Sequence, residues 1–149
     1  MRATLAEALK TALKAGDKRR TSTLRLIQAA IHDRDIAQRG AGKDPVTDEE
    51  ILQILTKMVK QRQESAKAFE DGNRLELAAQ EREESVIISE YLPKQMSEDE
   101  VRAAARKAIA DVGAEGLRDM GRAMAALKER YPGQMDFGKA SGIIKELLQ

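Results

Sequence analysis

Side chains that could take part in chemistry occur at several places in the chain, but none forms a complete catalytic set. Lys18 stands four residues before Ser22, a spacing that brings an amine close to a hydroxyl on one helix face. A Ser–Lys nucleophile also needs a pocket lined with hydrogen-bond donors, which an exposed helix without a glycine-rich loop does not supply. We therefore expect no catalysis from this pair.

Metal and phosphate chemistry has no better support. His32 is the one histidine and cysteine is absent, so a zinc or di-iron site of familiar composition cannot form. The stretch Gly40–Lys43 has a Gly-Lys pair but lacks the spacing of a phosphate-binding loop. The acidic run Glu81–Glu84 includes Arg82, as is typical of a solvated helix face. We predict no catalytic residue, no metal site and no cofactor.

Charge is segregated along the chain, although the net charge is only +1. From Arg2 to Arg25 there are seven basic residues and two acidic ones, whereas Asp44 to Glu90 has six basic and twelve acidic residues. Two interpretations remain open: the two segments attract each other within the protein, or the basic segment binds phosphates. Because only 3% of the residues are aromatic, recognition of RNA shape and backbone is favoured over base stacking.

The composition predicts an all-α protein, since the chain is 34% charged, has few aromatic residues and has only three prolines. Apolar residues recur at the spacing of one helix face in seven blocks. The predicted helices cover about Thr4–Lys14, Asp17–Gln38, Thr47–Phe69, Leu75–Tyr91, Ser97–Val112, Met120–Tyr131 and Asp136–Leu148. The expected inward residues include Ile36, Leu75 and Val86.

Local signals mark where several of these helices begin and end. Thr47 with Glu50, and Ser97 with Glu100, predict capping boxes. Gly16 predicts a left-handed C-cap.

A domain boundary is expected near Leu92 to Ser97, because the residue before Pro93 disfavours helical geometry. The boundary divides the chain into a four-helix N-terminal domain, residues 1–92, and a small three-helix C-terminal domain, residues 93–149. No apolar run approaches the ~18 to 20 residues that span a bilayer, and the N-terminus lacks the apolar stretch of a signal peptide. We expect a cytoplasmic protein that does not contact membranes.

Four stretches, taken together, resemble the YqeY family. They are Asp17–Arg20 followed by Leu24–Ile31, then Lys60–Ser65, Tyr91–Ser97 and Asp119–Met124. The likeness extends over nearly the whole chain. The C-terminal part also resembles the helical tail domain of GatB, a subunit of the glutamine-dependent tRNA amidotransferase.

The resemblance implies an all-helical, two-part protein in a family grouped with carbon–nitrogen ligases that use glutamine as the amido donor. In the amidotransferase the tail engages tRNA, while the chemistry resides in parts that are absent here. We therefore expect a tRNA-binding or amidotransferase-associated accessory protein without its own active site. Two alternatives remain: a component or relative of such a ligase, and a helical protein–protein adaptor.

The resemblance and the local basic excess together indicate the candidate RNA contacts. Arg122 stands where the tail pattern has lysine, whereas Gln134 replaces a second lysine and removes one cation from this face. Gly121 either lets a phosphate or a neighbouring helix approach the backbone, or permits tight packing of its own helix. Asp136 is expected to be an N-cap. The candidate RNA-binding residues are Lys18, Arg19, Arg20, Arg122, Lys128 and Lys139.

Overall fold

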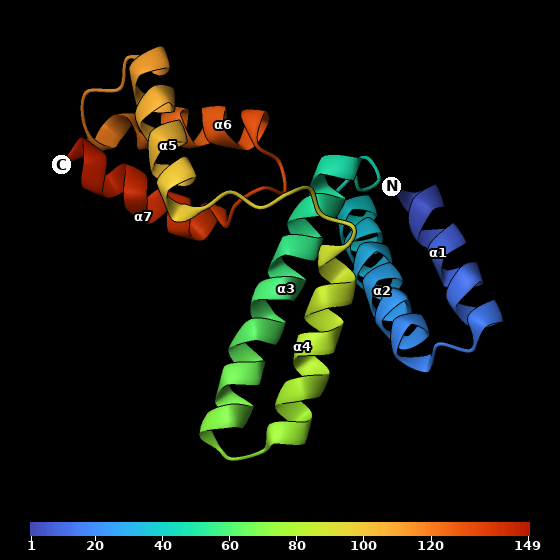
Figure 1. Ribbon diagram of the computed structural model, residues 1–149. Coiled ribbons are helices and arrows are strands. Elements are labelled where there is room, and N and C mark those ends of the chain that lie inside the picture. The colour runs from blue at the N-terminus through green and yellow to red at the C-terminus, as the bar shows by residue number, and fades with distance from the viewer. The chain divides into compact units, whose positions relative to one another are not determined.

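The computed structural model describes all residues, Met1–Gln149, and contains seven α-helices and no β-strand. The prediction of an all-α protein is confirmed. Internal contacts divide the chain into two compact units, Met1–Leu92 and Pro93–Gln149, which contain α1 to α4 and α5 to α7 respectively (Figure 1). None of the helices combines the length and the apolar character that a membrane span requires.

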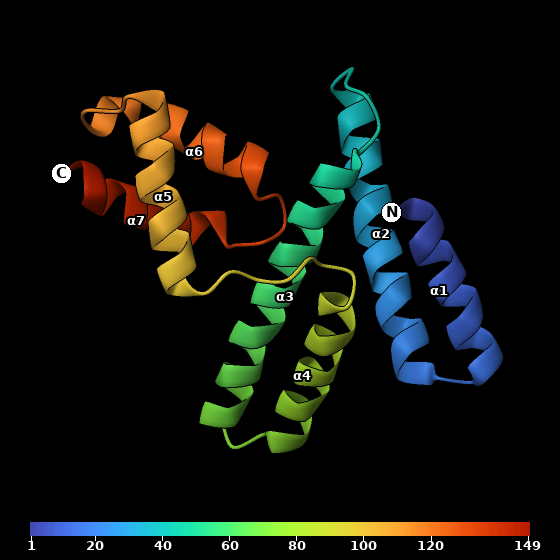
Figure 2. The same cartoon turned by 45° about the horizontal axis from the view of Figure 1, so that its top comes forward.

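The first unit is built from two helical hairpins, which Figures 1 and 2 show as antiparallel pairs. Its helices are α1 (Arg2–Ala15), α2 (Lys18–Gly40), α3 (Asp48–Asp71) and α4 (Leu75–Ser89). The α1–α2 and α3–α4 pairs pack against each other through one apolar core, so the two hairpins form a single unit. The large core side chains, each at most 1% exposed, are Leu5, Leu24, Ile27, Ile51, Leu55 and Ile88.

Side-chain caps form where the sequence predicts them. Thr47 accepts a hydrogen bond from the Glu50 backbone N–H, and the Glu50 carboxylate accepts one from the Thr47 backbone N–H. Ser97 and Glu100 form the same reciprocal pair at the start of the next unit's first helix. Gly16 ends α1 in the left-handed conformation, with φ of 69°. Both capping boxes and this C-cap are confirmed.

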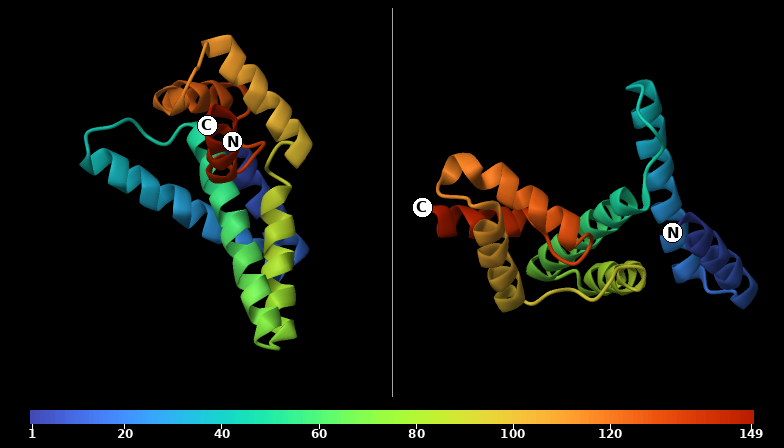
Figure 3. Two further views of the ribbon diagram at one scale, coloured as in Figure 1. Left: turned by 90° about the vertical axis from the view of Figure 1, so that its left-hand side faces the viewer. Right: turned by 90° about the horizontal axis from the view of Figure 1, so that it is seen from above.

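Three apolar residues expected to face inward do not. Ile36 is 53% exposed. It belongs to the C-terminal part of α2, and Figure 3 shows that this part of the helix extends away from the other helices of its unit before the connection to α3. Leu75 and Val86 are 62% and 64% exposed. They lie three turns apart on one side of α4, while Ile88 faces the core from the other side.

The second unit is a three-helix bundle whose core contains many small residues. Its elements are α5 (Glu98–Val112), a 3-10 turn (Leu117–Asp119), α6 (Met120–Arg130) and α7 (Phe137–Leu148). Ala104, Ala105 and Ala108 of α5 are buried against Leu127 of α6 and Ile144 of α7, which brings the helices close together.

Two features set the ends of this bundle. Asp136 is the N-cap of α7, as predicted, and accepts a hydrogen bond of 2.8 Å from the Gly138 backbone N–H. The segment before α5 is tied to the turn before α7, because the Met96 N–H donates to the Gln134 carbonyl oxygen at 2.9 Å. These two hydrogen bonds fix the segment before α5 and the first turn of α7 in place.

Candidate nucleic-acid interface

Arg19 and Arg20 lie in the first turn of α2 and are paired with carboxylates of the same unit. Arg20 forms an ion pair with Glu90, and its hydrogen bond lowers the pKa of that carboxyl. Arg19 Nε lies 3.3 Å from a carboxylate oxygen of Glu83. For these two arginines the structure shows the attraction between the basic and acidic segments, which was one of the two interpretations left open by the sequence.

A buried carboxylate lies between two arginines where α2, α3 and α4 meet. Glu84 of α4 is only 7% exposed. It accepts a hydrogen bond of 3.1 Å from Arg62 Nε of α3 and lies 3.6 Å from Arg19 Nη1 of α2. Because a buried charge is costly without partners, this cluster ties the three helices together.

Arg122 connects α6 to the end of α5. Its Nη1 donates a hydrogen bond of 2.8 Å to the carbonyl oxygen of Val112, the last residue of α5, and its Nη2 lies 3.0 Å from Asp119. The arginine therefore satisfies a carbonyl that has no partner within its own helix. Its side chain remains 57% exposed, so part of the guanidinium faces solvent.

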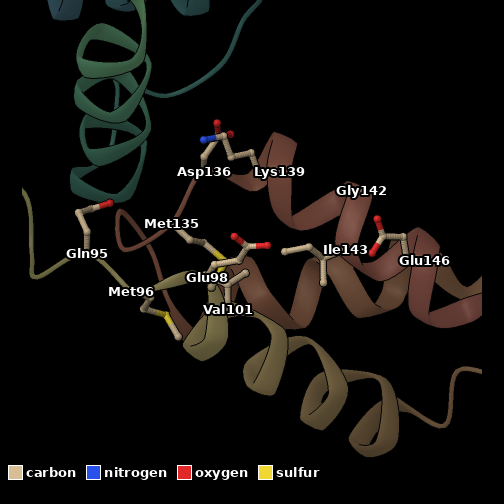
Figure 4. Close-up of a pocket in the computed structure, with 10 residues that line it drawn as sticks. All are labelled: Gln95, Met96, Glu98, Val101, Met135, Asp136, Lys139, Gly142, Ile143 and Glu146. Atoms are coloured by element: carbon tan, nitrogen blue, oxygen red, sulfur yellow. The ribbon is translucent and has the colours of Figure 1, made fainter. Parts of the chain in front are cut away.

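The three lysines among the candidates are placed differently. Lys18 and Lys128 are exposed and form no ion pair. Lys139 is exposed at the rim of a cavity, at the same end as Asp136 (Figure 4). The six predicted cations thus divide into three arginines that make internal contacts and three lysines at the surface.

Three further cations belong with Lys18, and sequence reasoning did not single them out. Lys10 and Lys14 of α1, and Arg25 of α2, are exposed and form no ion pair. Since α1 and α2 form one antiparallel hairpin, we call Lys10, Lys14, Lys18 and Arg25 the hairpin cations. The basic excess in the sequence included these residues but could not distinguish them from paired arginines.

Lys18 is the first residue of α2. It follows the N-cap Asp17, whose carboxylate accepts a hydrogen bond from the Arg20 backbone N–H, and the first turn itself contains no acidic residue. The helix macrodipole makes this end positive, so a cation here is unfavourable and an anion is favourable. Arg19 is paired with Glu83 of α4, and Arg20 is paired with Asp17 and with Glu90, which follows α4, whereas Lys18 forms no ion pair. A bound anion would supply a partner.

Gly121 has no role in packing within the protein. It is exposed in α6, and no atom would lie within 4 Å of a Cβ at this position. The interpretation that it permits tight packing of its own helix is therefore wrong. No neighbouring helix of the chain approaches Gly121 either, and the approach of a phosphate to its backbone stays a prediction.

The other residues considered for chemistry lie apart from one another. His32 is exposed and lines a cavity of about 290 Å³ together with Asp35. Ser22 is exposed on α2. No group of three histidine, cysteine, aspartate or glutamate side chains is placed to hold a metal ion.

Asp35 anchors the connection between α2 and α3. The Arg2 guanidinium donates two hydrogen bonds to its carboxylate, at 2.9 and 2.8 Å, and the Val46 backbone N–H donates another at 2.9 Å. The Arg2 bonds and then the Val46 bond lower the pKa of Asp35 to about 2. The carboxylate is therefore more acidic in the folded protein than in the unfolded chain.

This pKa shift predicts a specific acid sensitivity. A lowered folded pKa stabilises the protein above the unfolded value, and the stabilisation is lost as the pH falls from about 4 toward about 2. We expect Asp35→Asn to lower the melting temperature at neutral pH, and the difference from wild type to close over that acid range. Thermal melting across this pH series measures it, and a difference that stays constant would contradict the assignment.

Comparison with protein families places the chain among known proteins. The family model described as Yqey-like protein matches residues 2–148. The chain belongs to the YqeY family. Because the match runs through both units, the YqeY pattern covers the hairpin cations of the first unit as well as Arg122 and Lys139 of the second. No curated protein matches this YqeY chain.

Proposed function

We propose that this YqeY-family protein binds tRNA through its phosphate backbone and acts as an accessory protein without an active site of its own. The observation that carries the proposal is the set of hairpin cations, four exposed positive charges that no carboxylate neutralises. Phosphate contacts supply most of the affinity in sequence-independent nucleic-acid binding. Lys128 and the exposed part of Arg122 provide further contacts in the second unit.

The aromatic residues support recognition of backbone and shape over base stacking. All four aromatic side chains, Phe69, Tyr91, Tyr131 and Phe137, are half-buried. Tyr91 packs against the core of the first unit, and Tyr131 and Phe137 pack against that of the second. Side chains used for packing present little ring face to a base, so contacts to phosphates and to folded RNA remain.

The six cations predicted from the sequence have different roles in the proposed tRNA binding. Lys18 and Lys128 contact phosphate directly. Arg19 and Arg20, which are paired with α4, position the start of α2 so that Lys18 faces the RNA. Lys139 contributes least, because Asp136 lies at the same end of its cavity rim.

In this proposal a separate amidotransferase-like enzyme carries out the reaction. The resemblance of the tail to that of GatB supports such a partner, which would activate the tRNA-borne acid and transfer the amide. The YqeY-family chain would hold the tRNA, and its units, residues 1–92 and 93–149, would act as two domains.

Binding of the full chain to tRNA over a range of salt concentrations tests the proposal. With about six phosphates neutralised, by the four hairpin cations together with Lys128 and Arg122, we expect affinity to fall about 1,000-fold between about 50 and 200 mM salt. Fluorescence anisotropy of labelled tRNA measures this, with a neutral polymer as the control ligand. Equal affinity for tRNA and the neutral polymer, or binding to tRNA that does not change with salt, would refute it.

A further inference from the structure

The second unit contains a cavity of about 530 Å³ between the start of α5 and α7 (Figure 4). Its floor is apolar, formed by Val101, Met135 and Ile143, which are 8%, 3% and 9% exposed. Figure 4 shows these side chains directed toward one another from three separate segments. A cavity of this size and lining fits a bulky apolar side chain.

Gly142 forms part of the cavity wall from within α7. No atom would lie within 4 Å of a Cβ at this position, and the residue is exposed. Glycine inside a helix is less favourable than alanine, so the fold itself gains nothing from it. Without a side chain here, another backbone can come close to α7.

The rim of the cavity is predominantly acidic. Glu98, Asp136 and Glu146 line it, against one lining cation, Lys139. Arg102 lies between two of these carboxylates, 3.4 Å from Glu98 and 3.3 Å from Glu146. Asp99 and Glu100 add two carboxylates in the first turn of α5. Lys94 lies close enough to Glu100 to help lower the pKa of that carboxyl, so five carboxylates near the rim stand against three cations, Lys94, Arg102 and Lys139.

We propose that this cavity docks a basic amphipathic helix of a partner protein, which inserts an apolar side chain and places lysine or arginine residues against the acidic rim. The apolar floor and the bare wall at Gly142 account for the anchor and for the close approach of the partner's backbone. The acidic excess favours a basic partner and repels the phosphates of RNA. The inference goes beyond the proposed tRNA binding and shares with it only Lys139, the cation that contributes least there.

A model peptide tests the docking site on the full chain. The probe is a labelled helical peptide of about 16 residues, with leucines at one-turn spacing between lysines. We expect micromolar binding, weakened about tenfold or more when serine replaces the leucines or glutamate replaces the lysines. Binding of the glutamate peptide as tight as that of the lysine peptide would overturn the proposal, as would no binding of the lysine peptide.

Two matched glycine variants locate the site. Gly142→Leu fills the cavity, whereas Gly121→Leu adds the same side chain to α6, where there is also open space. Both are expected to keep the helical circular dichroism signal and the melting temperature of wild type or higher, since leucine favours helix more than glycine does. Peptide binding is expected to fall about tenfold or more in Gly142→Leu alone.

Three further outcomes decide the case. Gly142→Ala, the most conservative change in the cavity wall, is expected to weaken peptide binding less than Gly142→Leu does. Peptide binding that is unchanged in both Gly142 variants would refute the site. Loss of tRNA binding in Gly142→Leu, without loss of peptide binding, would assign the cavity to RNA and also refute it.

Discussion

Replacing Arg62 with methionine is expected to destabilise the first unit by about 3 kcal/mol, the cost typical of a broken buried ion pair. The Glu84 carboxylate, 7% exposed, would keep only Arg19 at 3.6 Å. Methionine retains much of the apolar volume of the arginine stem, so the loss reports on the charge rather than on packing.

A matched surface pair provides the control. Arg82 of α4 pairs with Glu70 of α3, so it joins the same two helices, but its side chain is 51% exposed. Arg82→Met is expected to cost less than about 1 kcal/mol, as exposed ion pairs do. The double variant Arg62→Met with Glu84→Leu removes both charges and is expected to recover much of the stability lost in Arg62→Met.

Urea unfolding of the full-length variants, followed by far-ultraviolet circular dichroism, measures these differences. An Arg62→Met variant no less stable than Arg82→Met would show that the buried cluster does not hold the helices together. A double variant less stable than Arg62→Met would show that Glu84 is not penalised when its partner is removed.

Much of the fold could be predicted from local sequence because helix ends are set by neighbouring residues. Thr47 and Ser97 each form a capping box with a glutamate only three residues later in the chain. Gly16 adopts the left-handed conformation, which residues other than glycine rarely do. Burial depends instead on which helix lies opposite. Ile36 and Val86 have helical spacing, yet no helix of their unit covers them, so periodicity placed them wrongly.

The same reason limits what the sequence could say about the site. Counting charges identified the basic segment, but pairing depends on contacts between α2 and α4, which are distant in the sequence. Arg19 meets Glu83 across 64 residues, whereas Lys18, its neighbour in the chain, meets no carboxylate. Only the packed structure distinguishes cations that pair with carboxylates from exposed cations that form no ion pair.

Neutralising the four hairpin cations is expected to weaken tRNA binding about 100-fold at about 0.1 M salt. The variant replaces Lys10, Lys14, Lys18 and Arg25 with glutamine, which is polar, uncharged and favourable in helices. Because these residues are exposed and form no ion pair, we expect the melting temperature to stay near that of wild type. Anisotropy of labelled tRNA with the full-length variant measures the change.

A charge-matched variant separates the effect of the hairpin cations from the effect of lowering the net charge. Glutamine replaces four exposed cations on the other helices and connections of the first unit, namely Lys43, Lys57, Lys67 and Arg74. Both variants lose four positive charges, so long-range attraction to RNA falls by a similar amount. We expect the second variant to bind tRNA within about threefold of wild type, because it keeps the direct phosphate contacts.

The slope of the logarithm of tRNA affinity against the logarithm of salt concentration tests the central claim most directly, because it counts phosphate contacts. The hairpin variant is expected to show a slope shallower than wild type by about 3 to 4, and the charge-matched variant an almost unchanged slope. Equal slopes for wild type and the hairpin variant would contradict the claim that these four cations contact the RNA backbone.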